Sequence, residues 1–307
     1  SATPYVNVSN TYLKNKQYEE ALSMVEHVLG IDPELAPAWL NKGNALRGLK
    51  KPKEAIKAYS KALETDCNRS AIHCLIADCF HDLGCNLEAL THFEKAHRLD
   101  PKDVDPLIGI AFCQIRNRHL KVAESALIDV LAMEPQNCRA LAYYTILLQL
   151  DERTDELNVF ADFDRDVFEF TFPVPENYKN LGIFNQKLCA ALQKDKSLVS
   201  EPPDKTTRGG SQSGELTSQR DPEITAFHDT LKKVLNDFLR DIKPQNEHPH
   251  YGSIPSDYRI QSWSTILDAE GHQLSHLHPT GWLSGVYYAQ VPPELSKNDP
   301  KNRGWLE

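Results

Sequence analysis

The sequence predicts a protein of two domains, in which a stack of paired helices is followed by an antiparallel β domain. Three observations lead to this fold class. The length of 307 residues exceeds that of one ordinary domain and suits two. In the first half, small and apolar residues recur every 34 residues, which is the signature of a helical repeat. After Leu150 that period stops, and short segments alternate apolar and polar residues as strands do.

Composition and charge limit the classes of function. The 34 Lys and Arg residues against 43 Asp and Glu give a formal net charge of −9, so we expect no nucleic-acid partner. No apolar run is long enough to cross a bilayer and no signal peptide is visible, so we expect no membrane partner. The seven cysteines form no Cys-x-x-Cys pair, which favours reduced thiols in an intracellular, cytoplasmic protein.

Four positions of the repeat agree over four units of 34 residues. They are Ala21, Ala55, Ala89 and Ala123; Val25, Tyr59, Phe93 and Leu127; Val28, Ala62, Ala96 and Val130; and Pro33, Pro101 and Pro135, with Cys67 in the remaining slot. Each unit is typical of two amphipathic helices that cross closely at a small residue and end at a proline. Residues 137–150 predict one more helix that caps the stack.

This pattern resembles the tetratricopeptide repeat family over residues 2–136, and residues 1–150 are expected to form four repeats with a capping helix. The resemblance implies a concave surface that holds an extended protein or peptide partner. It places Asn10, Asn44 and Asp78, which share one repeat position, on that inner face. Their side chains could hydrogen-bond a peptide backbone. The alternative, in which they only solvate the groove, is favoured because polar surface is the default.

The second half begins with a connector and mixed elements. Residues 151–164 are acidic and predict a connector, and residues 167–172 alternate as a strand that ends at Pro173. A helix is expected after this, along Leu181, Phe184 and Leu188. Residues 200–220 are rich in Gly, Ser, Thr and Pro and predict mostly loop. Asp221 and Pro222 are typical of a helix start, before an apolar stripe at Ile224, Phe227, Leu231, Val234, Phe238 and Ile242.

The C-terminal segments predict further strands over residues 258–268, 276–278 and 282–291. Strands that follow one another without helices between them indicate an antiparallel sheet, hence a sandwich or a jelly roll. Residues i and i+2 of a strand point to the same face, so His276 and His278 would present two imidazoles side by side. Such a pair suits Fe, Zn, Cu or Ni, although two histidines in a sheet are more often surface or hydrogen-bonded groups.

Other histidines give weaker signals. His248 and His250 flank a proline in an expected loop, where a rigid chelate is improbable. The histidines of the repeat region are expected to lie on solvated faces: His73, His81, His92, His97 and His119.

The run HLHPTGWLSGVYY at 276–288, followed by Val291 and Pro292, resembles the core motif of a 2-oxoglutarate/Fe(II)-dependent oxygenase family related to prolyl hydroxylases. Residues 172–176 and 207–213, and Trp263 with Leu267, resemble further blocks, so the likeness covers residues 165–307. It implies a jelly roll with flanking helices. Only four or five of about eight strands are found. We therefore expect an incomplete domain in a fragment that is itself inactive, with a distal histidine and a basic cosubstrate-binding residue beyond its end.

The resemblance also implies a metal and a cosubstrate. Fe(II) would be held by His276 and His278, although most of the wider superfamily carries Asp or Glu at the second position. The site could therefore use three histidines, or His278 could lie outside the coordination shell. One phenol of Tyr287 and Tyr288 would hydrogen-bond 2-oxoglutarate while the other packs in the core or on the surface. Ser284 shares the face of Tyr288.

The function implied is that of a 2-oxoglutarate- and Fe(II)-dependent dioxygenase, a hydroxylase whose repeats recruit a protein or substrate. The alternative is a peptide-binding adaptor in which the jelly-roll domain is degenerate and not catalytic.

Overall fold

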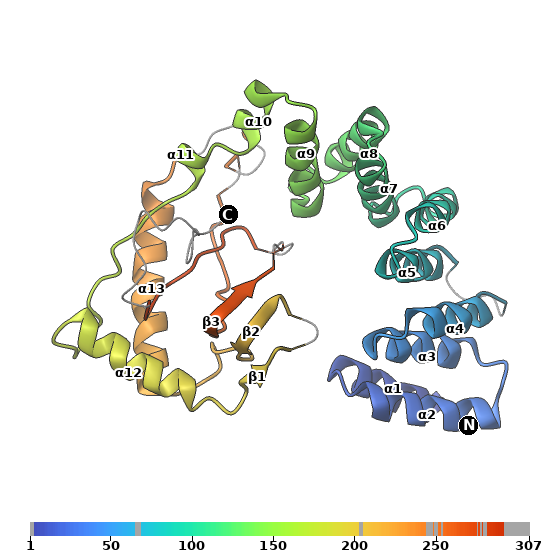
Figure 1. Cartoon of the computed structure of the whole chain (residues 1–307), viewed down its shortest axis with the longest axis horizontal. Coiled ribbons are helices and arrows are strands. Elements are labelled where there is room, and N and C mark those ends of the chain that lie inside the picture. Colours follow the sequence, from blue (N-terminus) through green and yellow to red (C-terminus); the bar gives the residue numbers. More distant parts are fainter. Residues whose placement is uncertain are drawn as a thin grey trace. The chain divides into compact units, whose positions relative to one another are not determined.

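A computed structural model describes residues 3–64, 69–202, 205–243, 248, 251–252, 254–274, 276, 278 and 281–291. The chain divides into two compact units, Ser1–Phe160 and Ala161–Glu307. Figure 1 shows the elements of both in chain order.

The first unit is a stack of antiparallel helix pairs, each packed chiefly against its neighbours in sequence. The helices are α1 (Thr3–Lys14), α2 (Tyr18–Ile31), α3 (Ala36–Gly48), α4 (Pro52–Glu64), α5 (Arg69–Asp82), α6 (Asn86–Leu99), α7 (Asp105–Arg116), α8 (Leu120–Met133), α9 (Cys138–Leu150) and α10 (Thr154–Phe160). The predicted solenoid is therefore confirmed.

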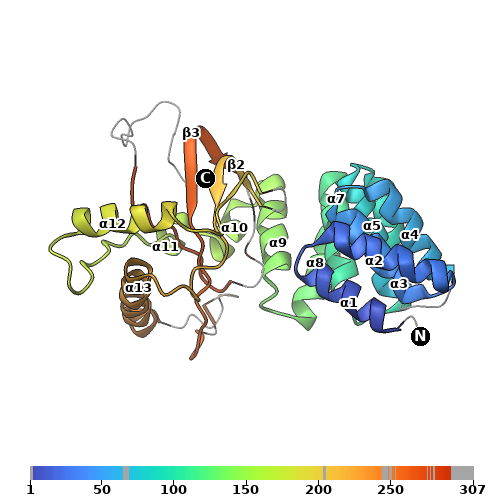
Figure 2. The same ribbon diagram turned by 90° about the horizontal axis from the view of Figure 1, so that it is seen from below.

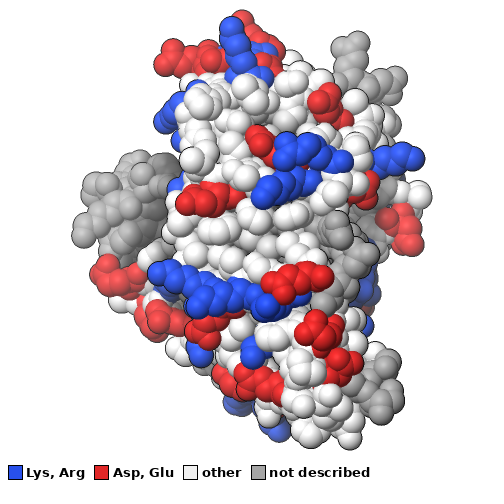
Figure 3. All heavy atoms as spheres, turned by 90° about the vertical axis from the view of Figure 1, so that its right-hand side faces the viewer, with Lys and Arg blue, Asp and Glu red and all other residues white. Residues whose placement is uncertain are grey.

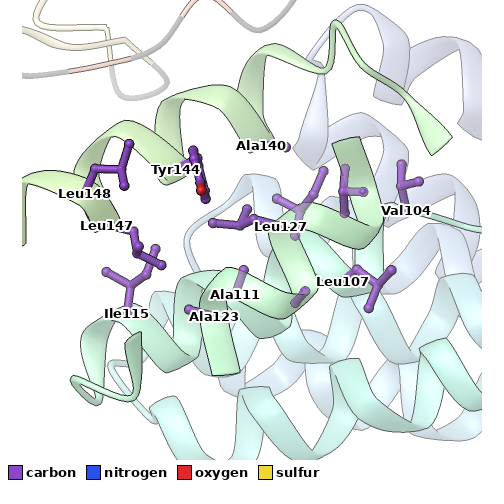
Figure 4. Close-up of a cluster of buried hydrophobic side chains, with 13 residues drawn as sticks. Val104, Leu107, Ala111, Ile115, Ala123, Leu127, Ala140, Tyr144, Leu147 and Leu148 are labelled. Atoms are coloured by element: carbon purple, nitrogen blue, oxygen red, sulfur yellow. The ribbon is translucent and has the colours of Figure 1, made fainter. Parts of the chain in front are cut away.

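The repeat registers form the core of this unit. All four alanines of the first register are fully buried, which allows the two helices of each pair to approach closely. Figure 4 shows the core formed by α7, α8 and α9, in which Leu107, Leu127 and Leu147 belong to one buried cluster. Their burial removes a continuous apolar face from water, and this burial is what stabilises a stack of amphipathic helices.

The turn inside each repeat has one left-handed residue, and these residues are also spaced by 34. They are Lys16, Lys50, Gly84, Arg118 and Glu152, with φ between 59° and 74°. The last lies between α9 and α10, so the repeat geometry continues past residue 150. Part of the segment expected to be a connector is therefore helical.

The second unit contains α11 (Phe163–Asp166), α12 (Leu181–Gln193) and α13 (Pro222–Asp241) with β1 (Val199–Ser200), β2 (Thr207–Gln212) and β3 (Thr265–Gln273). The three strands form one antiparallel sheet in the order β1-β2-β3, which agrees with the expected incomplete jelly roll with flanking helices. Figure 2 shows α12 lengthwise, with α13 seen nearly end-on below it. The carboxylate of Asp221 accepts hydrogen bonds from the amides of Glu223 and Ile224, so α13 begins where the sequence predicts a helix start.

The core of this unit lies between α12 and α13. Phe184 and Ile224 are buried there together with Phe172, Leu188 and Leu216. The ring of Phe172 stacks on Phe227, with 5.3 Å between centroids.

The prediction that residues 200–220 are mostly loop holds for the described residues, but β1 and β2, which lie within or beside this range, were not predicted. The glycines that suggested a loop serve the pairing of β2 with β3. Gly209 has φ of +60° at an irregularity of the register, and a Cβ on Gly210 would lie 2.9 Å from the Cα of Leu267. Such a bulge and such a close approach both require glycine.

Two predicted strands are wrong. Residues 167–172 form no strand, and the rings of Phe168 and Phe170 both pack on Phe238 of α13, at 4.9 and 5.7 Å. Phe168 and Phe170 keep the alternation of an extended segment, in which residues i and i+2 share a face, but no strand forms because this segment is not part of the described sheet. Residues 282–291 form no strand either, and the described sheet consists of β1, β2 and β3 alone. Of the strand expected over 258–268, only 265–268 belong to β3.

Candidate functional site

The candidate metal site follows directly after β3. The amide of Leu274 donates to the carbonyl of Thr206 at 2.9 Å, which extends the pairing of β2 and β3 by one step. His276 and His278 lie beyond this point and outside β3. Neither of these two described residues is in a strand, so the strand predicted over residues 276–278 is wrong at both. Leu277 lies outside the described residues.

The two imidazoles of this pair lie close together, with 4.8 Å between ring centroids and 78° between the planes. Nδ1 of His276 is 2.8 Å from the carbonyl oxygen of Leu274. Because a carbonyl oxygen only accepts, Nδ1 carries the proton and Nε2 keeps its lone pair for a metal. The ring of His278 packs on Trp263, with 5.4 Å between centroids. Burial, together with the neighbouring His276, lowers the pKa of His278. This ring is therefore neutral at pH 7.

This donor set fits Fe(II) in kind, because neutral imidazole is a common ligand of iron in proteins. A facial triad needs a third ligand. Among the described residues, no three His, Cys, Asp or Glu side chains gather where a metal could bind. The described chain thus offers two imidazoles of such a set.

The candidate cosubstrate residues occupy different surroundings. The hydroxyl of Tyr287 donates to Oδ1 of Asn185 at 2.6 Å, and its ring packs on Phe172 at 4.5 Å. Tyr287 is therefore engaged in the core between α12 and α13. Tyr288 is 47 % exposed and Ser284 is also exposed. Of the two phenols, that of Tyr288 is the more exposed.

The candidate groove residues also differ from one another. Asn10 on α1 is exposed, whereas Asn44 on α3 accepts from the hydroxyl of Tyr59 at 2.8 Å. Asp78 on α5 forms an ion pair with Arg47 at 2.9 Å. Burial raises the pKa of Asp78 even though the charge of Arg47 acts in the opposite direction. Two of the three side chains are therefore engaged within the repeats.

Sequence reasoning missed an aromatic row that joins α5, α7 and α9. The rings of His81 and Phe112 lie 4.6 Å apart, and those of Phe112 and Tyr143 lie 5.4 Å apart. The guanidinium of Arg116 lies 5.7 Å from the centroid of Phe112. These three rings are spaced by 31 residues rather than 34. A search of the sequence for aromatic residues at this second spacing could have found the row.

The expectation that the repeat histidines are simply solvated is wrong for several of them. His81 is partly buried and belongs to the aromatic row, whereas His119 is exposed as expected, with its Nδ1 2.9 Å from Oε1 of Gln114. His73 and His92 are both partly buried and bring their Nδ1 atoms to 3.0 Å.

Charge forms no dominant surface of one sign on the face in Figure 3, where basic and acidic side chains lie interspersed. Among the described residues, no helix combines the length and the apolar character needed to cross a bilayer.

Comparisons with protein families agree with both halves of this description. Tetratricopeptide repeat models match residues 2–35 and 36–66, and the family described as "Putative 2OG-Fe(II) oxygenase" matches residues 261–306. The chain thus joins tetratricopeptide repeats to a segment of this oxygenase family. The matched segment includes β3 and the histidine pair.

Curated relatives and solved structures give more distant likenesses. The human protein named Protein O-mannosyl-transferase TMTC3 is 25% identical over 190 residues, which are 58% of this chain and 21% of that protein. Its mouse counterpart is 25% identical over 156 residues, 49% of this chain and 17% of that protein. The chain therefore spans about a fifth of the length of these relatives.

Among solved structures, YrrB, described as a TPR protein with an unusual peptide-binding site, is 22% identical with a TM-score of 0.45. The match covers 51% of this chain and 81% of that one. The pilus biogenesis factor PilW is 20% identical with a TM-score of 0.47, over 51% and 73% of the two chains.

Proposed function

We propose that the chain belongs to a 2-oxoglutarate- and Fe(II)-dependent dioxygenase, a hydroxylase whose repeats recruit a protein or substrate. One observation carries the proposal: two imidazoles 4.8 Å apart follow β3 inside the segment that matches the oxygenase family. The adaptor alternative gives no reason for two adjacent imidazoles at this place.

The residues of the site divide the work. Nε2 of His276 and the ring of His278 would hold the iron, which supplies oxidative decarboxylation of 2-oxoglutarate when bound. The carbonyl of Leu274 fixes the tautomer and the orientation of His276. Trp263 covers one side of His278 and limits the access of water to that ring. The phenol of Tyr288 would hydrogen-bond the cosubstrate, and Ser284 would lie beside it.

The test measures Fe(II) and 2-oxoglutarate binding to the full chain under anaerobic conditions, by the visible charge-transfer band of their chelate. His276→Ala and His278→Ala should each abolish this band. His278→Asp should retain it, because a carboxylate occupies this position in most of the wider superfamily. Succinate formation is then followed in any form of the protein that binds iron.

The matched control is His272→Ala, since His272 is exposed on β3 and pairs with Arg208 across the sheet. This variant should bind Fe(II) as the unaltered chain does. Equal iron binding in the unaltered chain, His276→Ala and His278→Ala would refute the proposed ligands. An absence of Fe(II) binding in all forms would favour the adaptor alternative.

The repeats would recruit the partner through the face that carries Asn10, Asn44 and Asp78. The aromatic row adds a contact surface for an extended peptide, because rings give large contact areas at low conformational cost. Phe112→Ala should weaken the capture of a peptide array by the full chain, whereas Leu87→Ala, at an exposed position of α6, should not. An identical pattern of captured peptides in both variants would contradict recruitment through this row.

A further inference from the structure

The third repeat, formed by α5 and α6, carries two histidines where the other repeats carry apolar residues. His73 occupies the position held by Trp39 in the second repeat and Leu107 in the fourth. His92 occupies the position of two alanines, Ala58 and Ala126, which are 2% and 7% exposed. The two changes occur in the same repeat. They lie at positions whose side chains touch across the helix pair.

The contact between the two imidazoles is made through the atoms that can bind a metal. Nδ1 of His73 lies 3.0 Å from Nδ1 of His92, and the ring centroids are 5.1 Å apart. A metal bound to two imidazoles at about 2.0–2.1 Å holds their nitrogens about 3 Å apart. The present separation therefore needs little adjustment. Phe80 packs on His92, with 5.6 Å between centroids, and holds that ring in place.

The geometry points to a second metal site, in which Nδ1 of His73 and Nδ1 of His92 chelate one divalent transition-metal ion such as Zn²⁺. Water would complete the coordination, since both side chains are partly exposed. Without metal, one ring donates its Nδ1 proton to the other. On binding, that proton moves to Nε2 of the same ring, so both rings stay neutral and no proton is lost.

Two further observations bear on this site. Burial lowers the pKa of both rings, that of His92 to about 4, so neither ring is protonated at pH 7. The ammonium of Lys95, an exposed side chain on α6, also lowers both pKa values. The same positive charge opposes a bound cation, so its removal should tighten metal binding.

The test titrates Zn²⁺ into the full chain by calorimetry, in a His276→Ala/His278→Ala background that removes the proposed iron ligands. One Zn²⁺ per chain should bind. His73→Leu and His92→Ala install residues that neighbouring repeats carry, so the fold should tolerate them. Each should weaken the binding of Zn²⁺ by about tenfold or more. Lys95→Gln should strengthen it by about two- to fivefold.

The matched control is His119→Ala, which removes a repeat histidine outside the pair and should leave Zn²⁺ affinity unchanged. Thermal melts establish that each variant is folded. With Cu²⁺ as a second probe, electron paramagnetic resonance should detect two coordinated imidazoles, and one in either single variant. Zn²⁺ binding that is absent, or that is the same in His73→Leu and His92→Ala as in the background, would overturn the assignment. The result does not depend on the oxygenase proposal, because the background variant lacks the proposed iron ligands His276 and His278.

Discussion

The two units of this chain are built from contacts of different range. In the first unit each helix packs on its neighbours in sequence, so one repeat contains most of what determines its structure. In the second unit, β2 pairs with β3 across more than fifty residues that include α13. A local pattern is therefore sufficient to predict the solenoid but not the sheet.

The largest expected effect comes from emptying the core of either unit. Tyr59 and Phe184 are both fully buried, the first in the solenoid and the second between α12 and α13. Tyr59→Ala should lower the free energy of unfolding of the first unit by about 3–5 kcal/mol, and Phe184→Ala should do the same to the second. Native-state hydrogen exchange resolves which helices lose protection in each variant.

The control for the solenoid is Tyr59→Phe, which keeps the ring and removes only the hydrogen bond to Asn44. It should cost about 1 kcal/mol. If Tyr59→Ala reduced protection equally in α3 and in α12, the two units would share one folding transition and the comparison would fail.

A smaller effect is expected where β2 and β3 approach each other. Gly210→Val places a side chain 2.9 Å or less from the backbone of Leu267 and should force the strands apart. The second unit should lose about 1–3 kcal/mol of stability while the solenoid is unchanged. Denaturant unfolding followed by near-ultraviolet circular dichroism measures this loss.

Gly285→Val is the matched substitution, because a Cβ at Gly285 would meet nothing within 4 Å. It should change stability by no more than about 0.5 kcal/mol. Equal destabilisation by the two substitutions would mean that the close approach of the strands does not determine the need for glycine.

These contrasts explain what the sequence could and could not predict. The positions of Ala21 and its equivalents predicted buried helix crossings because each contact partner lies within one repeat. Within residues 200–220, which are mostly loop as predicted, β2 was not predicted because Gly209 and Gly210 are also typical of turns. Their role in a bulge depends on Gly271 and Leu267, which are far away in sequence.

The candidate site follows the same rule. The proximity of His276 and His278 could be predicted, since two residues separated by one position are close in any extended segment. The packing of Trp263 on His278, and that of Tyr287 on Phe172, could not, because each joins distant segments. The pairing of His73 with His92 joins two helices of one repeat, and a comparison of equivalent repeat positions would have found it.

The smallest effect is expected from a change of pH, because the pKa of one carboxyl is shifted in each unit and the two shifts have opposite directions. Burial would raise the pKa of Glu215. Hydrogen bonds from the Ser262 amide at 3.0 Å and the Thr217 hydroxyl at 2.8 Å outweigh burial and lower it. Glu215 therefore stabilises the folded state above the pKa of an unfolded glutamate, about 4.3. This stabilisation is lost as pH falls through the lower pKa that Glu215 has in the folded protein.

Burial raises the pKa of Asp78, so this carboxyl keeps its proton to a higher pH in the folded solenoid than in the unfolded chain. The folded state therefore loses stability as pH rises from about 4 through the pKa of Asp78 in the folded protein. Glu215→Gln should cost about 1 kcal/mol at pH 7 and progressively less as the solution is acidified. The stability of the unaltered chain relative to Asp78→Asn should instead decrease as pH rises through that window. Urea unfolding of both variants between pH 3 and 7 measures the two slopes. Slopes of the same sign would show that hydrogen bonds to Glu215 and burial of Asp78 do not set these ionisations.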